Sequence, residues 1–440
     1  MESLSPGVLQ HKMNRSQPHV ELLAPAGNFE KLETAIHFGA DAVYLSGKDF
    51  SLRNFSGNFS LDEIEAAVSL GCSHNVKIYI ACNVYSRNHE QLNLRKYLTQ
   101  LGKIRPDGVI VADPAIFMAA RDLMPGVPIH ISTQTNTTNY ATAQFWQNLG
   151  ADRIIAAREL SLAEIQEIVT KSRLAVEAFV HGAMCISYSG RCLLSSFLAH
   201  RDSNRGRCAH PCRWNYAVVE EKRPGQYLPV SEDERGTYIF NSRDLCMIDH
   251  IPTLIESGLA ALKIEGRMKG IHYVASTVKA YREAIDAYYH HPDDYRVQQD
   301  WLDTLDSVNQ RGYCTGFYFG DPVQTEPNLE LTRPAYEHRL VGKVVSVATA
   351  GTVVVDIRNR LATGEAVEFL SPGRPVQHDA IPRMFDLASG PVTVAHAGMQ
   401  VEMEFKTTCR PNDLIRRRDP LNASPRIDSM LPPFDQENQP

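Results

Sequence analysis

Eight short apolar runs, rich in β-branched residues, recur along the first 267 residues, and their spacing is the strongest constraint on the fold. They occupy residues 21–26, 42–46, 77–83, 108–113, 128–134, 153–157, 175–182 and 261–267. Segments between them, such as 28–39, 60–71 and 161–169, repeat apolar residues three and four positions apart and begin at an Asn or Ser that can cap a helix. Eight strands alternating with helices predict an α/β fold, a (β/α)8 barrel, in which function concentrates at the carboxyl ends of the strands.

Changes in composition divide the chain into parts. The predicted parts are a flexible tail over 1–19, a TIM-like barrel over 20–292 with a cysteine-rich insertion at 183–260, a helical and loop connector over 293–335, a small β-barrel domain over 336–418 and a disordered tail over 419–440. The small β-barrel is predicted from alternating β-branched residues and glycine-bearing turns after Leu340. Five prolines between Pro420 and Pro440 favour disorder there.

Composition bounds the class of protein. The chain has 440 residues, of which 43% are hydrophobic, enough for two or three domains. It contains no run of eighteen apolar residues, and its first 19 residues lack the apolar centre of a signal peptide, so we expect a cytoplasmic protein with no membrane span. The formal net charge of −6 argues against indiscriminate binding of nucleic acid, which rests on a general excess of Lys and Arg. Any contact with RNA must therefore be local.

The nine cysteines are unevenly distributed. Five of them fall in one stretch of 62 residues: Cys185, Cys192, Cys208, Cys212 and Cys246. Glycines and prolines between them favour loops that can fold thiolates around one centre, and four converging thiolates are what an iron-sulfur cluster needs. Three other interpretations stay open, namely buried apolar thiols, disulfides and a zinc site, since Cys208 and Cys212 have zinc-knuckle spacing. The remaining cysteines are isolated and fit buried thiols: Cys72, Cys82, Cys314 and Cys409.

Residues 177–195 read EAFVHGAMCISYSGRCLLS, which resembles the signature of the U32 family, the collagenase-like peptidases, at every defined position. The resemblance extends from ELLAPAG at residue 21 through NSRDLC to LKIEGRMK at residues 262–269. The members most similar in appearance are tRNA hydroxylation proteins of the TrhP type. This resemblance implies hydroxylation of the wobble uridine of certain tRNAs, a 4Fe-4S cluster, and prephenate in place of dioxygen as the hydroxyl donor.

The resemblance also bears on the cluster ligands. Some family members use a later cysteine that corresponds to Cys246, whereas others lack it and keep the pair that matches Cys208 and Cys212. This chain has both. The predicted ligands are Cys185, Cys192, Cys208 and Cys246, with Cys212 as the alternative to Cys246. A full set of four thiolates leaves no open iron position, which favours an electrostatic or redox role for the cluster.

Two charged side chains belong to the seventh strand segment. Strand alternation puts Glu177 and His181 on one face, which we expect to be the inner one. His181 could then carry a proton or bind prephenate with Glu177 beside it, because imidazole titrates near neutral pH. A hydrogen-bonded core pair is the alternative.

The last strand segment carries three charges that alternate with apolar residues: Lys263, Glu265 and Arg267. Charges that point into a barrel are costly unless they pair or bind something. Lys263 and Arg267 are predicted to clamp the two carboxylates of prephenate, Arg267 in bidentate fashion. A structural ion pair between Glu265 and Arg158, from the end of the sixth segment, is the alternative. Glu265 is the third catalytic candidate, and Arg158 is a candidate for substrate binding.

Two further sets of residues are candidates for binding substrate. Asn83, Asp113, Gln134 and Asn136 end strand segments and could hydrogen-bond a base edge or the donor. Between residues 191 and 213, five arginines are accompanied by a single acid, Asp202; they are Arg191, Arg201, Arg205, Arg207 and Arg213. This loop predicts a dock for RNA phosphates, with Arg191, Arg205 and Arg207 as its main candidates, or else a solvated charged loop.

These features together favour an RNA-modifying hydroxylase that forms 5-hydroxyuridine in the anticodon loop of tRNA, where unpaired bases can be splayed out and read. Hydroxylation of ribosomal RNA or of a ubiquinone precursor, both known in the family, stays open. A peptidase is the alternative from another class, although the sequence has no HExxH motif and Ser195 lacks a GxSxG context. A non-catalytic redox sensor is a third interpretation. The sequence leaves the oligomeric state open.

Overall fold

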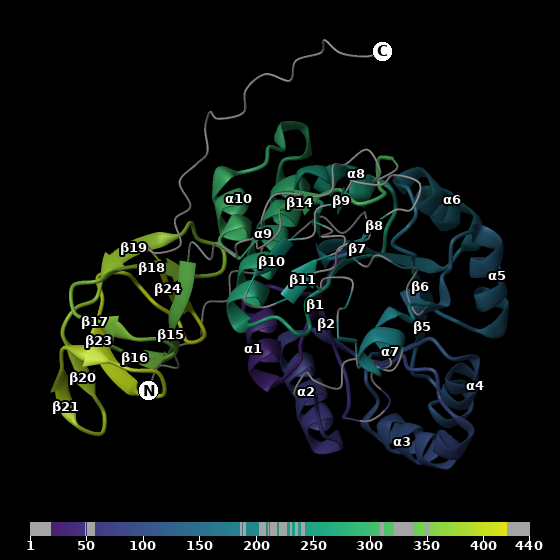
Figure 1. Cartoon of the computed structure of the whole chain (residues 1–440), viewed down its shortest axis with the longest axis horizontal. Coiled ribbons are helices and arrows are strands. Elements are labelled where there is room, and N and C mark those ends of the chain that lie inside the picture. Colours follow the sequence, from purple (N-terminus) through teal and green to yellow (C-terminus); the bar gives the residue numbers. More distant parts are fainter. Residues whose placement is uncertain are drawn as a thin grey trace, which may run out of the picture.

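The computed structural model describes residues 19–48, 50, 58–184, 187, 191–201, 208–209, 211, 218–219, 227–228, 231–233, 236–238, 243–308, 312–320, 338–347 and 352–419. These residues form a barrel of strands and helices and, beside it, an antiparallel β domain (Figure 1).

Eight parallel strands form the barrel: β1 (Glu21–Pro25), β2 (Ala42–Leu45), β3 (Lys77–Cys82), β4 (Gly108–Val111), β5 (Ile129–Ile131), β6 (Arg153–Ile155), β7 (Ala175–Ala183) and β13 (Ala261–Ile264). Consecutive strands pair in parallel, and β13 closes the ring by pairing with both β7 and β1. Seven of these strands lie within the segments predicted from the sequence, and β7 extends one residue beyond its predicted segment, 175–182. The predicted TIM-like barrel is therefore confirmed.

Helices surround this ring: α1 (Phe29–His37), α2 (Leu61–His74), α3 (Gln91–Ile104), α4 (Pro114–Leu123), α5 (Tyr140–Leu149), α6 (Leu162–Ser172), α8 (Ile251–Glu256) and α9 (Ile271–His290) (Figure 1). The predicted caps Asn28, Ser60 and Ser161 each accept a hydrogen bond from a backbone N–H of the first turn. Ser60 and Ser161 do so within complete capping boxes, which fixes where these helices begin. None of the described helices is long and apolar enough to cross a membrane.

The connection between β7 and β13 interrupts the alternation. It contains α7 (Leu194–Ala199) and the short strands β8 (Val218–Val219), β9 (Tyr227–Leu228), β10 (Ser231–Asp233), β11 (Gly236–Tyr238) and β12 (Asp244–Cys246). Strand β12 runs antiparallel to the end of β7, with Asp244 opposite Ala183, and β14 (Tyr313–Cys314) pairs in parallel with β12. The insertion therefore starts at, and returns to, the carboxyl end of β7, which is the functional end of such a barrel.

The carboxyl-terminal strands form an antiparallel domain with a core of its own. They are β15 (His338–Val347), β16 (Thr352–Ile357), β17 (Leu361–Ala362), β18 (Ala366–Leu370), β19 (Gln377–Ala380), β20 (Met384–Asp386), β21 (Gly390–Val392), β22 (Val394–Ala395), β23 (Gln400–Glu404) and β24 (Leu414–Arg418). Eight of them build one sheet, in the order β19-β18-β24-β15-β16-β23-β20-β21. Val355, Phe369 and Ile415 are among the side chains buried in its core. The confirmed architecture is thus a TIM-like barrel followed by an antiparallel sheet.

Polar contacts join the two parts. His37 Nε2 of α1 lies 2.8 Å from Asp413 Oδ1, whose side chain is fully buried. The guanidinium of Arg416 on β24 donates to Ser307 Oγ at 2.7 Å, just after α10 (Gln299–Asp306). These contacts fix the β domain against the α1 and α10 side of the barrel (Figure 1).

Candidate functional site

A layer of paired charges fills the centre of the barrel; we call it the charged layer (Glu21, Arg153, Glu177 and Lys263). Arg153 Nη1 lies 2.7 Å from Glu21 Oε1 and 3.3 Å from Glu177 Oε2, and Lys263 Nζ lies 2.7 Å from Glu177 Oε1. Burial lowers the pKa of Lys263, while Glu177 acts in the opposite direction. Because Glu177 and Lys263 bind each other here, the structure does not present Lys263 as an open cation for a donor carboxylate.

Three side chains lie nearer the carboxyl ends of the strands. The Arg158 guanidinium carbon is 4.0 Å from the centre of the Phe179 ring, and Arg158 Nη2 is 3.7 Å from Glu265 Oε2. The Tyr44 hydroxyl lies 3.4 Å from the same Glu265 oxygen. The ion pair between Arg158 and Glu265, the structural alternative for these two residues, is therefore present. Both side chains stay partly exposed at the barrel mouth, where a ligand could still reach them.

Amide side chains at the mouth have unsatisfied hydrogen-bonding capacity. The side-chain oxygens of Asn83, Gln134 and Asn136 are buried and have no hydrogen-bond partner within the part of the chain that the structure describes. They follow β3 and β5, as predicted from their place at strand ends. The great majority of buried polar atoms in native proteins have a hydrogen-bond partner, so these oxygens at the barrel mouth are candidates to accept hydrogen bonds from a ligand or from water.

A second pair of cations lies at the start of α1. Arg267, in the turn after β13, is almost completely buried, and its carbonyl oxygen accepts a 3.4 Å hydrogen bond from Lys31 Nζ. Burial lowers the pKa of Lys31, the negative charge of Glu30 acts to raise it, and the positive charge of Arg267 acts to lower it. An anion between these cations would offset their repulsion. Lys31 was not among the residues that the sequence singled out, because nothing in its helical pattern shows that α1 begins beside this turn.

His181 does not share the inner face with Glu177. The Tyr281 hydroxyl of α9 donates to Val180 O at 2.7 Å and lies 3.4 Å from His181 Nδ1, so His181 faces the helix outside the barrel. Burial, with a smaller contribution from Lys269, lowers the pKa of His181 to about 3. The predicted common face is wrong because the pairing of β7 with β13 shifts register between Phe179 and His181, which breaks the strand alternation.

Two of the clustered cysteines lie on segments that are joined. The buried Ser195 Oγ, three residues after Cys192, accepts a 2.9 Å hydrogen bond from the N–H of Ala209, which follows Cys208. Both thiols are half-buried and form no disulfide. This hydrogen bond holds the two cysteine segments side by side, a role for Ser195 that the sequence did not reveal. It also leaves Ser195 a poor candidate for a nucleophile, since its hydroxyl is buried and engaged.

Cys246 has different surroundings. It is buried at the end of β12, and the Tyr281 hydroxyl lies 3.8 Å from its sulfur. Burial raises the pKa of the Cys246 thiol to about 11. Cys185 and Cys212 lie outside the described residues. Among the residues that are described, no three His, Cys, Asp or Glu side chains gather as a metal site, so the set of four cluster ligands stays a prediction.

The arginine-rich loop is described only at its start. Burial raises the pKa of Tyr85, in the loop after β3, while the positive charge of Arg191 opposes that shift. Arg191 therefore contributes positive charge to the electrostatic surroundings of Tyr85. Arg201 is also described, whereas Arg205, Arg207 and Arg213 lie outside the described residues.

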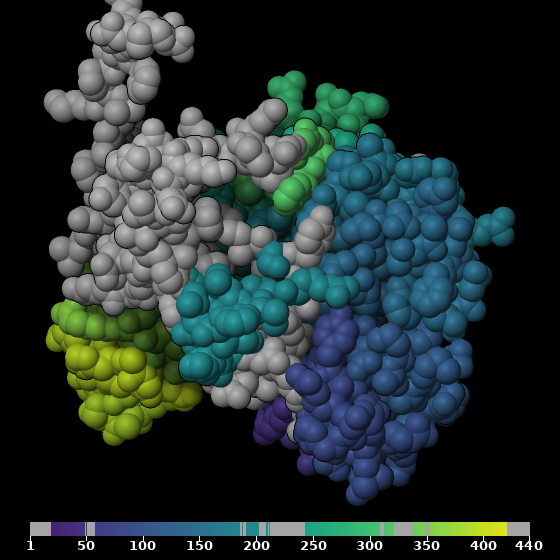
Figure 2. Space-filling model, turned by 45° about the vertical axis from the view of Figure 1, so that its right-hand side comes forward, coloured from purple at the N-terminus to yellow at the C-terminus, as the bar shows by residue number. Residues whose placement is uncertain are grey.

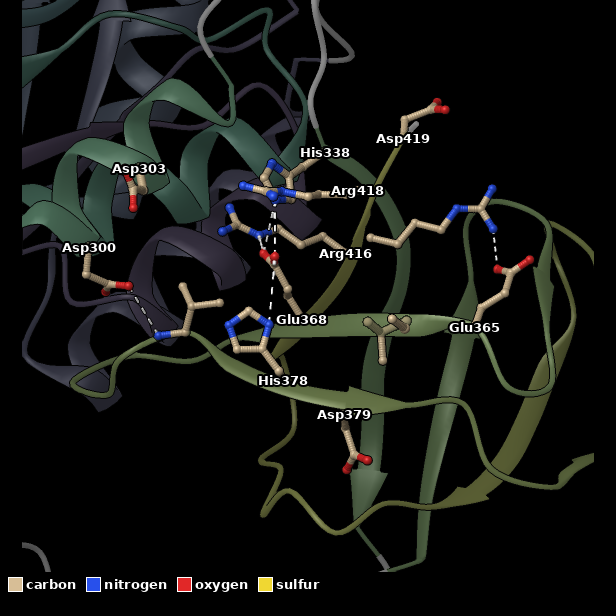
Figure 3. Close-up of a pocket in the computed structure, with 14 residues that line it drawn as sticks. Asp300, Asp303, His338, Glu365, Glu368, His378, Asp379, Arg416, Arg418 and Asp419 are labelled. Carbon is tan, nitrogen blue, oxygen red and sulfur yellow. Dashed lines mark hydrogen bonds and ion pairs between the residues drawn. The ribbon is translucent and has the colours of Figure 1, made fainter. Parts of the chain in front are cut away.

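A separate cleft of about 810 Å³ lies between α10 and the β domain (Figure 3). At its centre Glu368 accepts a 2.8 Å hydrogen bond from Arg416 Nε and lies 3.2 Å from His338 Nε2. Burial acts to raise the pKa of Glu368, but the hydrogen bond with His338 and the charge of Arg416 hold it at about 2. Six acids and three arginines line this cleft, so its charge does not favour RNA phosphates.

Comparison with known proteins identifies the family of this chain. The model of peptidase family U32 matches residues 27–328, and that of the U32 C-terminal domain matches residues 336–416. The chain belongs to peptidase family U32. The first match spans the barrel after β1 together with its insertion, and the second spans most of the antiparallel domain.

Relatives in the U32 family have different names. The tRNA hydroxylation protein P1 of Bacillus subtilis is 38% identical over 400 residues, which cover 90% of this chain and 94% of the relative. The tRNA hydroxylation protein P of Escherichia coli is 34% identical over 394 residues, covering 80% and 86%. A protein of Porphyromonas gingivalis named collagenase is 28% identical over 414 residues, covering 91% and 98%. A solved U32 peptidase is 18% identical with a TM-score of 0.37, covering 59% of this chain and 99% of that structure.

Residues of the U32 signature segment, 177–195, lie in three different environments. Glu177 belongs to the charged layer, His181 packs against α9, and Ser195 ties the cysteine segments together. Gly182 has a φ of 106°, and a Cβ there would lie 2.6 Å from the carbonyl oxygen of Glu265. Only glycine fits this position without a backbone shift. The signature thus couples the barrel interior to the cysteine-rich insertion.

Proposed function

We propose that this U32 protein is an enzyme that hydroxylates the wobble uridine of tRNA, forming 5-hydroxyuridine. The observation that carries the proposal is the similarity, along 90% and 80% of the chain, to two proteins named for tRNA hydroxylation. The mouth of the barrel supports it, because the side-chain oxygens of Asn83 and Gln134, unpaired within the described part of the chain, and the start of the cysteine-rich insertion, at the carboxyl end of β7, lie at the same end of the barrel. An anticodon loop offers unpaired bases to such a mouth, whereas a duplex would hide them.

The proposed roles follow the geometry of the mouth. Asn83 and Gln134 would hydrogen-bond the edge of the target base, since the side-chain oxygens of both are buried and have no partner among the described residues. Arg267 with Lys31, and Arg158 on the Phe179 ring, would bind the carboxylates of prephenate as donor. Glu265, next to Arg158, is the carboxylate best placed to hold a proton beside the bound substrate.

Further roles concern the loop, the charged layer and His181. Arg191, with Arg205 and Arg207 in the same loop, would contact the RNA backbone. Lys263 and Glu177 would act indirectly, by holding the charged layer in place under the mouth. His181, held neutral against α9, would position the end of β7 where the cysteine loop begins.

The proposed cofactor is a 4Fe-4S cluster held by Cys185, Cys192, Cys208 and Cys246, with Cys212 as the alternative fourth ligand. The support is their spacing and the hydrogen bond between Ser195 and Ala209, which keeps two of the cysteine segments together. Such a cluster would supply redox or electrostatic chemistry at the mouth. The chain's own residues would bind the RNA, orient the donor and exclude water.

The decisive experiment is mass spectrometry of tRNA nucleosides from a strain that lacks this protein and any second enzyme of the same activity. We expect the 5-hydroxyuridine derivatives to be lost in this strain and to return when the wild-type gene is restored. They should disappear again when prephenate synthesis is blocked. Unchanged derivatives would reject the tRNA substrate and bring forward ribosomal RNA or a ubiquinone precursor. Persistence without prephenate would reject the donor alone.

Peptide hydrolysis is the second candidate, because a relative covering 91% of the chain is named collagenase. The buried, hydrogen-bonded Ser195 does not support it. Cleavage of denatured collagen by iron-free protein would favour peptide hydrolysis. If the protein hydroxylates RNA but does not cleave denatured collagen, peptide hydrolysis is rejected.

A further inference from the structure

The segment from Arg191 to Arg201 presents an apolar surface at the rim of the mouth. Phe197 is 77% exposed, more than any other large hydrophobic side chain in the described part of the chain, and Leu193 and Leu198 are 57% and 46% exposed. The segment reads RCLLSSFLAHR, with an arginine at each end and no acid. Within the part of the chain that the structure describes, packing does not explain the exposure of this aromatic ring, whose segment carries an arginine at each end.

The placement of this segment is defined. Helix α7 stands forward on the face of the molecule, next to the α3 and α4 side of the barrel (Figure 2). Ser195, inside the helix, is fully buried and bound to the N–H of Ala209, so one side of α7 is anchored while Phe197 points to solvent. The segment follows the carboxyl end of β7, which lies at the mouth of the barrel. The exposed ring therefore belongs to an anchored helix on the segment that leaves the mouth.

We propose, on the basis of the function proposed above, that Phe197 is a stacking platform for an unpaired base of the RNA, with Arg191 at the neighbouring phosphate. Every nucleobase has a π-face, so an exposed ring binds unpaired bases with little sequence preference. The leucines on either side would cover the edges of the stacked base and exclude water. Because the bases of a duplex are stacked on one another, the platform favours loops over stems. The flanking positive charge complements the RNA backbone.

The test compares variants of the full-length protein purified with its iron. The probes are an anticodon stem-loop RNA with uridine at the wobble position and the same stem closed as a duplex. Phe197→Ala should weaken binding of the stem-loop about 5- to 150-fold, the range expected for loss of one stacked base, and leave duplex binding unchanged. Phe197→Trp should keep wild-type affinity. Phe385→Ala, which removes an exposed ring from β20 of the β domain, is the matched control and should have no effect.

Salt dependence separates stacking from charge. Phe197→Ala should leave the slope of log K against log salt unchanged, whereas Arg191→Gln should make it shallower by about 0.7 for one lost contact to single-stranded RNA. Unchanged stem-loop affinity in Phe197→Ala, with wild-type protein binding the RNA, would overturn the platform and leave the proposed function standing. If Phe197→Ala instead dissociates a dimer in sedimentation velocity at unchanged RNA affinity, the patch joins two copies of the chain and the proposal is wrong. Failure of the wild-type protein to bind the stem-loop would overturn the proposed function itself.

Discussion

The ammonium nitrogen of Lys263 lies 2.7 Å from a carboxylate oxygen of Glu177 in the centre of the barrel, and the two side chains are 4% and 0% exposed. Glu177 also faces Arg153, at 3.3 Å. Paired charges at this depth are retained because each balances another, and removal of one partner leaves an uncompensated buried charge. The charged layer therefore acts as a unit that supports the mouth above it.

Replacement of Lys263 by Met should lower the free energy of unfolding by about 3–5 kcal/mol, because Glu177 would lose its closest cation. Urea denaturation at about pH 7 measures this loss. Lys171→Met, which breaks the exposed pair with Glu167, is the matched control and should leave the midpoint unchanged. Equal midpoints for both variants would show that the charged layer does not contribute as a unit.

Replacement of Gln134 by Met should separate function from stability. The buried amide oxygen has no partner in the described structure, so its loss should leave the unfolding midpoint unchanged or raise it. The value of kcat/KM for RNA hydroxylation should fall about three- to tenfold, the worth of one hydrogen bond to substrate. Gln144→Met, on the outer helix α5, should leave both quantities unchanged. A lower midpoint with normal kcat/KM would assign Gln134 to the fold alone.

Cys192→Ser should lower bound iron and abolish hydroxylation together, because a thiolate ligand is lost. Iron analysis and nucleoside mass spectrometry on the same preparation measure both effects. Cys72→Ser, at an exposed position on α2, should change neither. Full iron content in Cys192→Ser would refute the ligand assignment.

The fourth ligand has its own test. Cys246→Ser should cost more iron than Cys212→Ser if the β12 cysteine completes the set. Binding would also require the buried Cys246 thiol, whose pKa burial raises to about 11, to release its proton to solvent as it coordinates the metal. The opposite order of iron loss would assign the position to Cys212.

Acid should weaken the β domain through Glu368. Its folded pKa of about 2 lies below the ordinary value, so its stabilisation is fully present above about pH 4.5 and is lost as the pH falls toward 2. Glu368→Gln should destabilise the protein at about pH 7, since the buried Arg416 loses its carboxylate, and should flatten the decline between about pH 4.5 and 2. Urea midpoints across this range test the prediction, and parallel curves for the two proteins would contradict it.

The eight strands, the main helices and the capping residues were predictable because their signals are local. Apolar periodicity defines β1 to β7 and β13, and an Asn or Ser at the right place defines where α1, α2 and α6 begin. The family was recognisable for the same reason, since its signature is one continuous segment at residues 177–195. A contiguous motif requires no knowledge of what lies beside it.

Only the tertiary structure decided which charges meet. The sequence suggested that Lys263 is free to bind a carboxylate of the donor, but the register of β13 against β7 brings it into an ion pair with Glu177. Strand alternation predicted that His181 faces inward, but the shift in that register turns it toward Tyr281. The sequence contained no local signal for the contact of Lys31 with Arg267 or for the exposure of Phe197. The physical reason is that the partners of a side chain depend on strand register and on helix packing between segments distant in sequence, which local periodicity does not contain.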